Sequence, residues 1–144
     1  MNTIPEYTLG KKASIFEKVK MKESEDVEKY IRQFYSDDIE IYESFFLLLL
    51  NIANETIGYA KISQGGITGT VVDIKILLKY VVDSLASGVV ICHNHPSGNL
   101  RPSVEDISLT KSIKEALKLL DSKLIDHIIL TSENYYSFSD NGLI

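Results

Sequence analysis

Apolar residues recur every three or four positions in three segments of the chain, and this period predicts amphipathic helices. The three segments are residues 24–35, 73–86 and 103–120. Ser24, Asp73 and Ser103 stand at the beginnings of these segments, where a short polar side chain can cap the free backbone N–H groups of a helix. Gly88 follows the second segment and is expected to end that helix.

Other segments carry the patterns of β-strands. Residues 39–51 begin with alternating apolar residues and end in a continuous apolar run, which is typical of a central strand covered on both faces. Residues 56–64 alternate and are expected to pair with that strand as a hairpin. Shorter strands are expected at residues 89–92, 124–131 and 135–138.

The resulting order of elements is α, β, β, α, β, α, β, β. It predicts a single α/β domain, bordering on α+β, with one mixed β-sheet flanked by helices. We expect this domain to cover residues 21–144 and an N-terminal arm to cover residues 1–20. Residues 1–12 are expected to form a loose arm or an edge strand.

Composition narrows the classes of protein. A chain of 144 residues, 44% of them hydrophobic, can bury one continuous core, which excludes a disordered chain. The net charge of −5 argues against a broad contact with nucleic acid, because such contacts need clustered Lys and Arg. Cys92 is the single cysteine, so no intrachain disulfide can form and a reducing, cytoplasmic compartment is expected. The longest apolar run, Phe45–Leu50, is far shorter than the ~20 residues of a membrane span, and no signal-peptide pattern is visible.

The most informative polar residues lie between the third predicted strand and the third predicted helix. His93 and His95 follow the strand, whose alternation places both imidazole rings on the same side. Asp106 lies near the start of the helix and shares a face with the apolar residues of its core side. A carboxylate there is unfavourable unless a cation neutralises it, and imidazole nitrogen and carboxylate oxygen are both zinc ligands. The three side chains therefore predict a metal site.

Each of these residues also has an ordinary structural explanation. Ser103 and Asp106 have nearly the spacing of a capping box, in which two side chains bind N–H groups at a helix start. Asn94, Pro96 and Gly98 are typical of a turn, and two histidines alone are weak evidence for a metal. The convergence of both histidines, the loop and the inward aspartate favours the metal site. Ser103 can cap the helix and still present its hydroxyl group to a ligand.

A resemblance to a known family rests on the same residues. His93, His95, Ser103 and Asp106 match the pattern H-x-H-x7-S-x2-D of the JAMM (MPN-type) metalloprotease domain. The hexapeptide HNHPSG that contains both histidines, together with ISQGG and DHII elsewhere, resembles the RadC branch of this family over roughly residues 20–144. The resemblance implies a Zn²⁺ ion held by His93, His95 and Asp106, and metal-assisted hydrolysis of a peptide or isopeptide bond by a zinc metallopeptidase.

The family also carries a glutamate on an upstream strand as the general base that takes a proton from water. The resemblance assigns this role to Glu43, which stands two residues before Phe45. A carboxylate within an apolar strand is unfavourable without a partner, which agrees with such a role. Glu40, at the entry of the strand, and Glu55, in the hairpin turn, are the alternatives. The resemblance further implies that Ser103 steadies the water or donates to the developing oxyanion.

A second interpretation is a nucleic-acid-associated accessory protein with little or no peptidase activity, because the RadC name points to DNA repair. RadC-type proteins commonly carry a helix-hairpin-helix module before the JAMM domain. The first 40 residues contain more acidic than basic residues and no hairpin glycine pattern, so we expect the short form without this module. No strong nucleic-acid binding and no membrane contact are expected. An unidentified peptide or protein is the expected substrate, and a homo-oligomer is compatible with the sequence.

Four further residues near these motifs are expected to play no direct chemical role. His127 is expected to be structural or to support a ligand from behind. Cys92 alternates away from the histidines and is expected to be a buried core thiol. Arg101 and Lys111 flank the site loop and are expected to be solvated, although either could contact a substrate or a phosphate.

Overall fold

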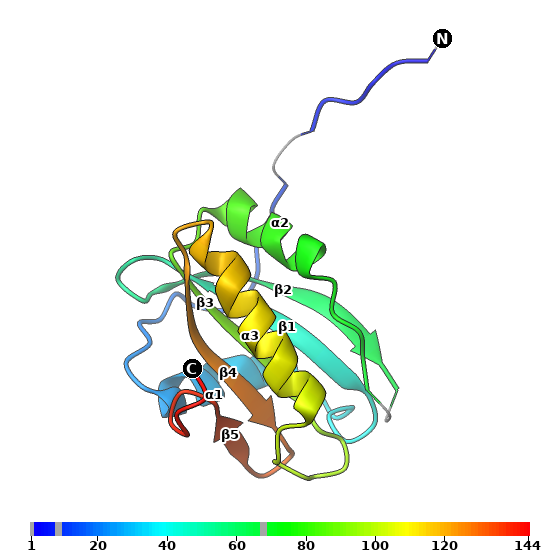
Figure 1. The fold of residues 1–144 in the computed structure, drawn as a ribbon, viewed down its shortest axis with the longest axis vertical. Helices are drawn as coiled ribbons and strands as arrows, with labels where there is room; N and C mark the ends of the chain where they lie inside the picture. The colour runs from blue at the N-terminus through cyan, green and yellow to red at the C-terminus, as the bar shows by residue number, and fades with distance from the viewer. Residues whose placement is uncertain (1, 8–9, 67–68) are drawn as a thin grey trace.

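A five-stranded mixed β-sheet forms the centre of the protein (Figure 1). The computed structural model describes residues 2–7, 10–66 and 69–144. The strands are β1 (Glu43–Leu50), β2 (Thr56–Gly65), β3 (Gly88–Asn94), β4 (Lys123–Leu130) and β5 (Tyr135–Ser137), in the spatial order β2-β1-β3-β4-β5. Only β3 and β4 are parallel to each other, and the other neighbours are antiparallel. The predicted mixed-sheet α/β fold and the predicted order of elements are thus confirmed.

Helices cover both faces of this sheet. The helix α1 (Ser24–Ile31) and the short 3-10 helix η1 (Arg32–Phe34) pack on one face, and the helices α2 (Ile74–Ser84) and α3 (Val104–Lys118) pack on the other. Figure 1 shows α2 and α3 in front of the sheet and α1 behind it. Within the described residues, no helix combines the length and apolar character needed to cross a lipid bilayer.

The central strand β1 explains why the sequence pattern there is continuous rather than alternating. Leu47 and Leu49 face the core shared with α2 and α3, while Phe46 and Leu48 face the core shared with α1. All four side chains are buried. A strand covered on both faces therefore needs apolar residues at successive positions, as predicted.

Several predicted element boundaries are wrong by a few residues. The N-cap of α1 is Glu23, not Ser24, because the Glu23 and Asp26 side chains form a capping box. The strand predicted from residue 39 begins at Glu43, because the N–H groups of Ile41 and Tyr42 both donate to the Asp38 carbonyl and form a turn.

Two helix ends also differ from the prediction. The helix α2 ends at Leu85 in the left-handed conformation (φ 54°), and the predicted terminator Gly88 instead opens β3. The helix α3 ends at Lys118, two residues before the predicted end, and its C-cap is Leu119. The predicted N-caps Asp73 and Ser103 are confirmed.

The N-terminal segment shows no helix or strand in residues 2–7 and 10–12, and residues 1, 8 and 9 lie outside the described residues. Lys20 forms an isolated bridge with Glu55. The predicted loose arm therefore agrees with the described part of residues 1–12, and the predicted edge strand does not.

The topology brings the ends of three elements, β1, β3 and α3, to one edge of the sheet. Because β1 runs antiparallel to β3, Phe45 pairs with His93, and the start of β1 lies beside the end of β3. Because β3 and β4 are parallel, the connection between them contains α3, whose N-terminus returns to the end of β3. Residues from β1, β3 and α3 can therefore meet at this edge.

Candidate metal centre

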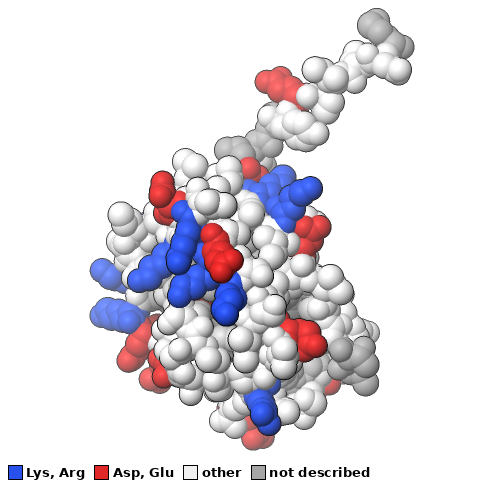
Figure 2. Space-filling model, viewed as in Figure 1, with Lys and Arg blue, Asp and Glu red and all other residues white. Residues whose placement is uncertain are grey.

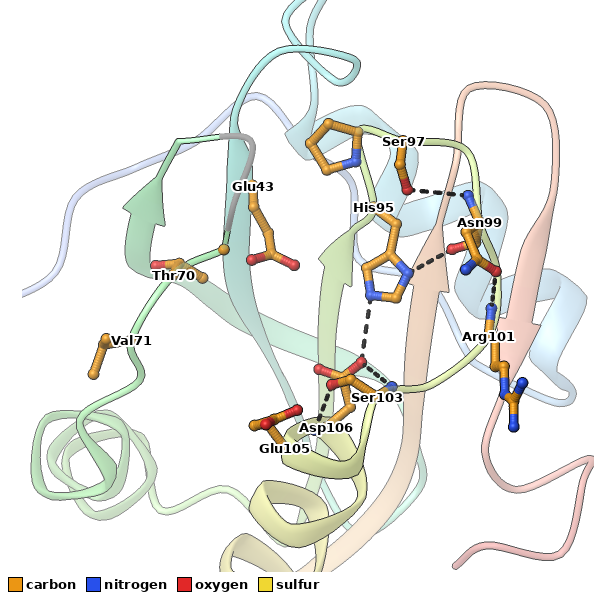
Figure 3. Close-up of a pocket in the computed structure, with 12 residues that line it drawn as sticks. Glu43, Thr70, Val71, His95, Ser97, Asn99, Arg101, Ser103, Glu105 and Asp106 are labelled. Carbon is orange, nitrogen blue, oxygen red and sulfur yellow. Dashed lines mark hydrogen bonds and ion pairs between the residues drawn. The ribbon is translucent and has the colours of Figure 1, made fainter.

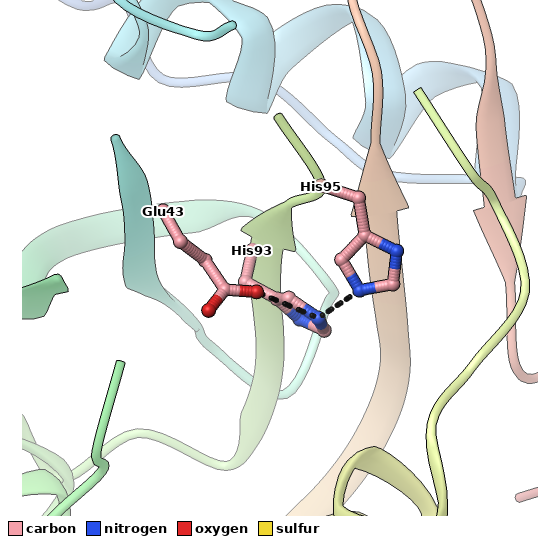
Figure 4. A group of neighbouring side chains, drawn as sticks. All are labelled: Glu43, His93 and His95. Atoms are coloured by element: carbon pink, nitrogen blue, oxygen red, sulfur yellow. Dashed lines mark hydrogen bonds and ion pairs between the residues drawn. The ribbon is translucent and has the colours of Figure 1, made fainter. Parts of the chain in front are cut away.

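The two histidines lie at the carboxyl end of β3 and face the same side, as their spacing predicts (Figure 4). Their Nε2 atoms are 3.0 Å apart. His93 is buried and is the next-to-last residue of β3, and the partly buried His95 is the first residue after the strand. The Nδ1 atom of His95 contacts the backbone carbonyl oxygen of Asn99 at 2.5 Å, which fixes the orientation of its ring.

Asp106 points at both histidines from the first turn of α3. Its Oδ1 atom lies 3.2 Å from His93 Nε2, and its Oδ2 atom lies 3.3 Å from His95 Nε2. The Ser103 N–H group donates to Asp106 Oδ2 at 2.8 Å, and the Asp106 N–H group donates to Ser103 Oγ at 3.0 Å. The capping box therefore exists, and it also orients the carboxylate toward the two imidazole rings.

Glu43 is the first residue of β1 and faces the histidines from the opposite side. Its Oε1 atom lies 3.9 Å from His93 Nε2, and its side chain is 13% exposed. Ligand atoms of Glu43, His93 and His95 all lie within 4.8 Å of one another, so these residues could hold a metal ion. Of the alternatives, Glu40 is exposed in the preceding turn, and Glu55 bonds to Asn51 in the β1–β2 turn.

The distances between the donor atoms fit a tetrahedral metal ion. Zinc bonds of about 2.0–2.1 Å require ligand atoms about 3.3–3.4 Å apart around a tetrahedron. The separations among His93, His95 and Asp106 are 3.0, 3.2 and 3.3 Å. The distance to Glu43 is longer, at 3.9 Å. Two imidazole nitrogens and one carboxylate form a donor set that zinc accepts.

The cluster changes the proton affinity of its members. Burial raises the pKa of Glu43 above its usual range, against the opposing effect of His93 and His95. Burial opposes ionisation of Asp106 too, but hydrogen bonds with His93 and His95 hold its pKa well below the usual range. Burial lowers the pKa of His95, but Asp106 and the Asn99 carbonyl outweigh it and raise this pKa overall. The Asp106 carboxylate beside the histidines thus favours its ionised form, while the Glu43 carboxylate binds a proton more readily than usual.

An open cavity of about 600 Å³ adjoins this cluster (Figure 3). Glu43 and Thr70 form one side of it, while Ser97 and Arg101 lie on the other. Ser103 also lines the cavity. Because the Ser103 hydroxyl oxygen accepts a hydrogen bond from Asp106, its own hydrogen remains able to point toward a bound molecule.

Comparison with known proteins identifies the family of the chain. Residues 21–143 match the family model of the RadC-like JAB domain. The chain belongs to the RadC-like JAB domain family. The resemblance to the RadC branch is therefore confirmed, and the mixed sheet with its covering helices is consistent with a JAB/MPN fold.

Several bacterial relatives are similar to this RadC-like JAB domain. A UPF0758 protein of Flavobacterium johnsoniae is 47% identical over 102 residues, covering 71% of this chain and 44% of that protein. A UPF0758 protein of Porphyromonas gingivalis is 40% identical over 103 residues, covering 71% and 45%. A UPF0758 protein of Coprothermobacter proteolyticus is 36% identical over 130 residues, covering 89% and 55%. The chain thus spans about half the length of these relatives, whose names state no activity.

Asn94 lies beside the site and hydrogen-bonds to the backbone around Glu43, whereas the sequence suggested a turn residue. Its side chain is fully buried, and its amide nitrogen donates to the carbonyl oxygens of Ile39 and Tyr42 at 2.6 and 2.7 Å. Its Oδ1 atom accepts from the Ser44 N–H group at 2.8 Å. Asn94 thereby fixes the backbone on both sides of Glu43. The sequence signal was a polar residue at the end of a largely apolar strand, on the face opposite the histidines.

The remaining singled-out residues lie as follows. His127 is fully buried in β4 and faces His93 rather than the cavity, and burial, followed by the charge of His93, lowers its pKa well below the usual range. Cys92 is a buried core thiol, as predicted, and burial raises its pKa to about 12. Arg101 lines the cavity and is exposed, whereas Lys111 is exposed on α3.

Proposed function

We propose that this protein is a zinc-dependent hydrolase of amide bonds, acting on a peptide or isopeptide bond. The observation that carries the proposal is the cluster of His93 Nε2, His95 Nε2 and the two carboxylate oxygens of Asp106, whose contacts are 3.0–3.3 Å long, with Glu43 beside it at a cavity. Membership of the JAB family, which often contains hydrolases, supports this assignment.

His93, His95 and Asp106 would hold the zinc ion. Their charges suit it, because two neutral imidazoles and one carboxylate leave a divalent cation with a net positive charge. A zinc ion in such a site acts as a Lewis acid and lowers the pKa of a coordinated water toward ~7. The metal site takes its ligands from β3, the loop after it and the start of α3.

Glu43 and Ser103 would move and stabilise charge around the reacting amide. Glu43 accepts a proton from the attacking water and delivers it to the leaving amine nitrogen. Its raised pKa favours this role, because an efficient base has a proton affinity closer to neutral pH. The Ser103 hydroxyl group donates its free hydrogen toward the carbonyl oxygen as negative charge develops there.

The test separates the base from the ligands. Glu43→Gln is expected to retain about one zinc ion per chain and to lose turnover of quenched fluorescent peptides and isopeptides by about 10²-fold or more. Glu40→Gln, in the exposed turn three residues earlier, is the matched control and should leave zinc content and turnover unchanged. Loss of zinc in Glu43→Gln together with loss of activity in Glu40→Gln would show that the base has been misassigned.

A second candidate function is nucleic-acid association, and a basic surface favours it. A cavity of about 480 Å³ is lined by Lys114, Lys118 and Lys123, at the opposite ends of α3 and β4 from the metal centre. Figure 2 shows Lys and Arg side chains gathered over the C-terminal end of α3. Positive side chains of this kind bind phosphate groups.

DNA-binding measurements distinguish the two functions. Since the chain carries a net charge of −5, we expect only non-specific DNA affinity, ~10⁻⁴ M or weaker at physiological salt. Nanomolar, salt-sensitive DNA binding would favour the second function if it survives His93→Ala with His95→Ala but is lost in Lys114→Gln with Lys118→Gln.

A further inference from the structure

His127 contacts His93 from behind, on the side away from the cavity. The Nδ1 atom of His93 lies 2.8 Å from Nε2 of His127. The other ring nitrogen of His127, Nδ1, lies 2.6 Å from the hydroxyl oxygen of Thr110 in α3. That hydroxyl group donates to the backbone carbonyl oxygen of Asp106 at 2.7 Å. His93 and Asp106, which both face the metal centre, are thus also joined by a second path through the protein interior.

The direction of every hydrogen bond in this path follows from its two ends. The path ends at a carbonyl oxygen, which can only accept, so Thr110 donates its hydroxyl hydrogen there and accepts from His127 Nδ1. A neutral His127 that carries its proton on Nδ1 has an unprotonated Nε2 atom. That atom must accept a hydrogen bond from the Nδ1–H group of His93. A neutral His93 is then protonated on Nδ1 and unprotonated on Nε2, the atom that faces His95 and Asp106.

We propose that His127 is a positioning residue that, together with Thr110, selects Nε2 of His93 as the metal-binding nitrogen. The proposal rests on the proposed metal function, because the choice of nitrogen matters only if a cation binds there. Metal-bound histidines generally donate their other N–H group to a protein acceptor, which fixes the ring and strengthens the ligand. Here that acceptor is a second imidazole, itself held in one protonation form by Thr110.

A purely structural role for His127 would leave part of this geometry without a reason. The ring stacks on Phe138 at a centroid distance of 4.3 Å and an interplanar angle of 16°, and an apolar ring could do the same. Both nitrogens nevertheless have hydrogen-bond partners, although the residue is fully buried. Stacking therefore explains the position of the ring, and the two hydrogen bonds explain why the ring is a histidine.

The first test uses the unaltered protein. In the zinc-loaded chain, long-range proton–nitrogen NMR correlations are expected to show His127 protonated on Nδ1 only and His93 bound to the metal through Nε2. A His127 ring protonated on Nε2, or metal bound through Nδ1 of His93, overturns the proposal. This measurement needs no substitution and so does not depend on a variant that folds.

The second test measures zinc affinity by competition with a chromophoric chelator. His127→Phe keeps a ring against Phe138 but removes the acceptor, and should weaken zinc binding by about 10–100-fold. His127→Gln offers an amide oxygen in place of Nε2 and should recover most of this loss. Thr110→Val should weaken binding by less than His127→Phe, whereas the matched control Thr110→Ser should not change it.

The outcomes separate this inference from the proposed function. A folded His127→Phe variant with unaltered zinc affinity overturns the positioning role while leaving the metal centre intact. If His127→Gln binds zinc as weakly as His127→Phe, the hydrogen-bond acceptor is not the property that matters, and the positioning role is likewise overturned. Failure of the unaltered chain to bind zinc overturns both. The thermal melts of the zinc-free variants show whether each one is folded before its affinity is interpreted.

Discussion

Two aspartates at the sheet, Asp106 and Asp126, differ in the partners that surround them. Asp126 is buried in β4 and accepts from the Ser137 hydroxyl group and from the N–H groups of His127 and Ser139. Asp106 accepts from one N–H group, that of Ser103, and otherwise faces the imidazole nitrogens of two histidines. The partners of Asp126 all carry hydrogens at every ordinary pH, whereas the two imidazole nitrogens that face Asp106 can be unprotonated.

This difference distinguishes Asp126, a structural carboxylate, from Asp106, a carboxylate placed to bind a cation. The three permanent donors satisfy both carboxylate oxygens of Asp126 and tie the C-terminal segment to β4. Asp106 has a strong preference for the ionised form, because hydrogen bonds with His93 and His95 lower its pKa despite burial. Burial alone therefore does not distinguish a metal ligand from a structural carboxylate. The distinguishing feature is whether the neighbouring groups always donate hydrogen bonds or can lack the hydrogen.

The largest expected effect is loss of the metal on removing two ligands. The unaltered protein should carry about one zinc ion per chain by elemental analysis, and His95→Ala with Asp106→Ala should carry none. At free zinc near 1,000 times its dissociation constant, binding adds about 4 kcal/mol to the free energy of unfolding, which the double variant should not gain. Stoichiometric zinc retained by the double variant would contradict the assignment.

The serines next to these two aspartates sharpen the comparison. The Ser137 hydroxyl hydrogen is used on Asp126, whereas Ser103 accepts from Asp106 and keeps its hydrogen for a bound molecule. Ser103→Gly should reduce turnover of any amide substrate by about 10²–10³, which is ~2.7–4 kcal/mol of activation free energy. Its stability should fall by only a few tenths of a kcal/mol, because glycine is tolerated at an N-cap.

Ser103→Asp is the companion variant. It retains a capping oxygen but removes the hydroxyl donor and adds a third carboxylate near the histidines, beside Glu43 and Asp106. Thermal melts and turnover measured on both variants show which role the serine has. Unchanged turnover in Ser103→Gly would leave Ser103 with the capping role alone.

Local spacing predicted the part of the site that is local in the chain. His93, His95 and Asp106 come from one strand–loop–helix segment, so strand alternation and helix capping place them together. Glu43 came from the family resemblance, because its position beside His93 depends on the antiparallel register between β1 and β3. The role of Asn94 was not predicted, because no periodic pattern in a sequence indicates hydrogen bonds to residues 50 and 55 positions earlier.

The same long-range contacts explain the wrong start of β1. Residues 39–42 continue the apolar alternation of the strand, yet Asn94 binds the carbonyl oxygens of Ile39 and Tyr42 and holds this segment as a turn. The helix end at Leu85 was missed for a related reason. A non-glycine residue in the left-handed conformation follows from the contacts around it, not from its own preference.

Substitution of Asp126 should affect stability without affecting the metal. Asp126→Ala leaves three donors, two of them in buried hydrogen bonds, without an acceptor and should lower the free energy of unfolding by about 3 kcal/mol. Asp126→Asn should cost much less, because its amide oxygen can accept both N–H groups while the Ser137 hydroxyl group turns to accept. Zinc affinity should match that of the unaltered protein in both variants. A tenfold loss of zinc affinity in Asp126→Asn would show that the two carboxylates are not independent.

The smallest expected effect is an opposite response of the two aspartates to acid. Burial raises the pKa of Asp126 in spite of its three donors, so the folded chain binds this proton more tightly than the unfolded chain, whose Asp pKa is about 3.9. As the pH rises from about 4 through the raised pKa, this group should therefore lower the free energy of unfolding, and as the pH falls through that window it should restore it. Asp106 has a lowered pKa, so its contribution is present above about pH 3.9 and is lost only as the pH falls further.

Urea unfolding of the zinc-free chain and of Asp126→Asn, between pH 7 and pH 4, isolates the effect of Asp126, since the variant cannot titrate at this position. The unaltered chain should gain stability relative to the variant as the pH falls. A relative loss would mean that the three hydrogen bonds outweigh burial at Asp126, and the two carboxylates would then differ in their partners but not in the direction of their response to acid.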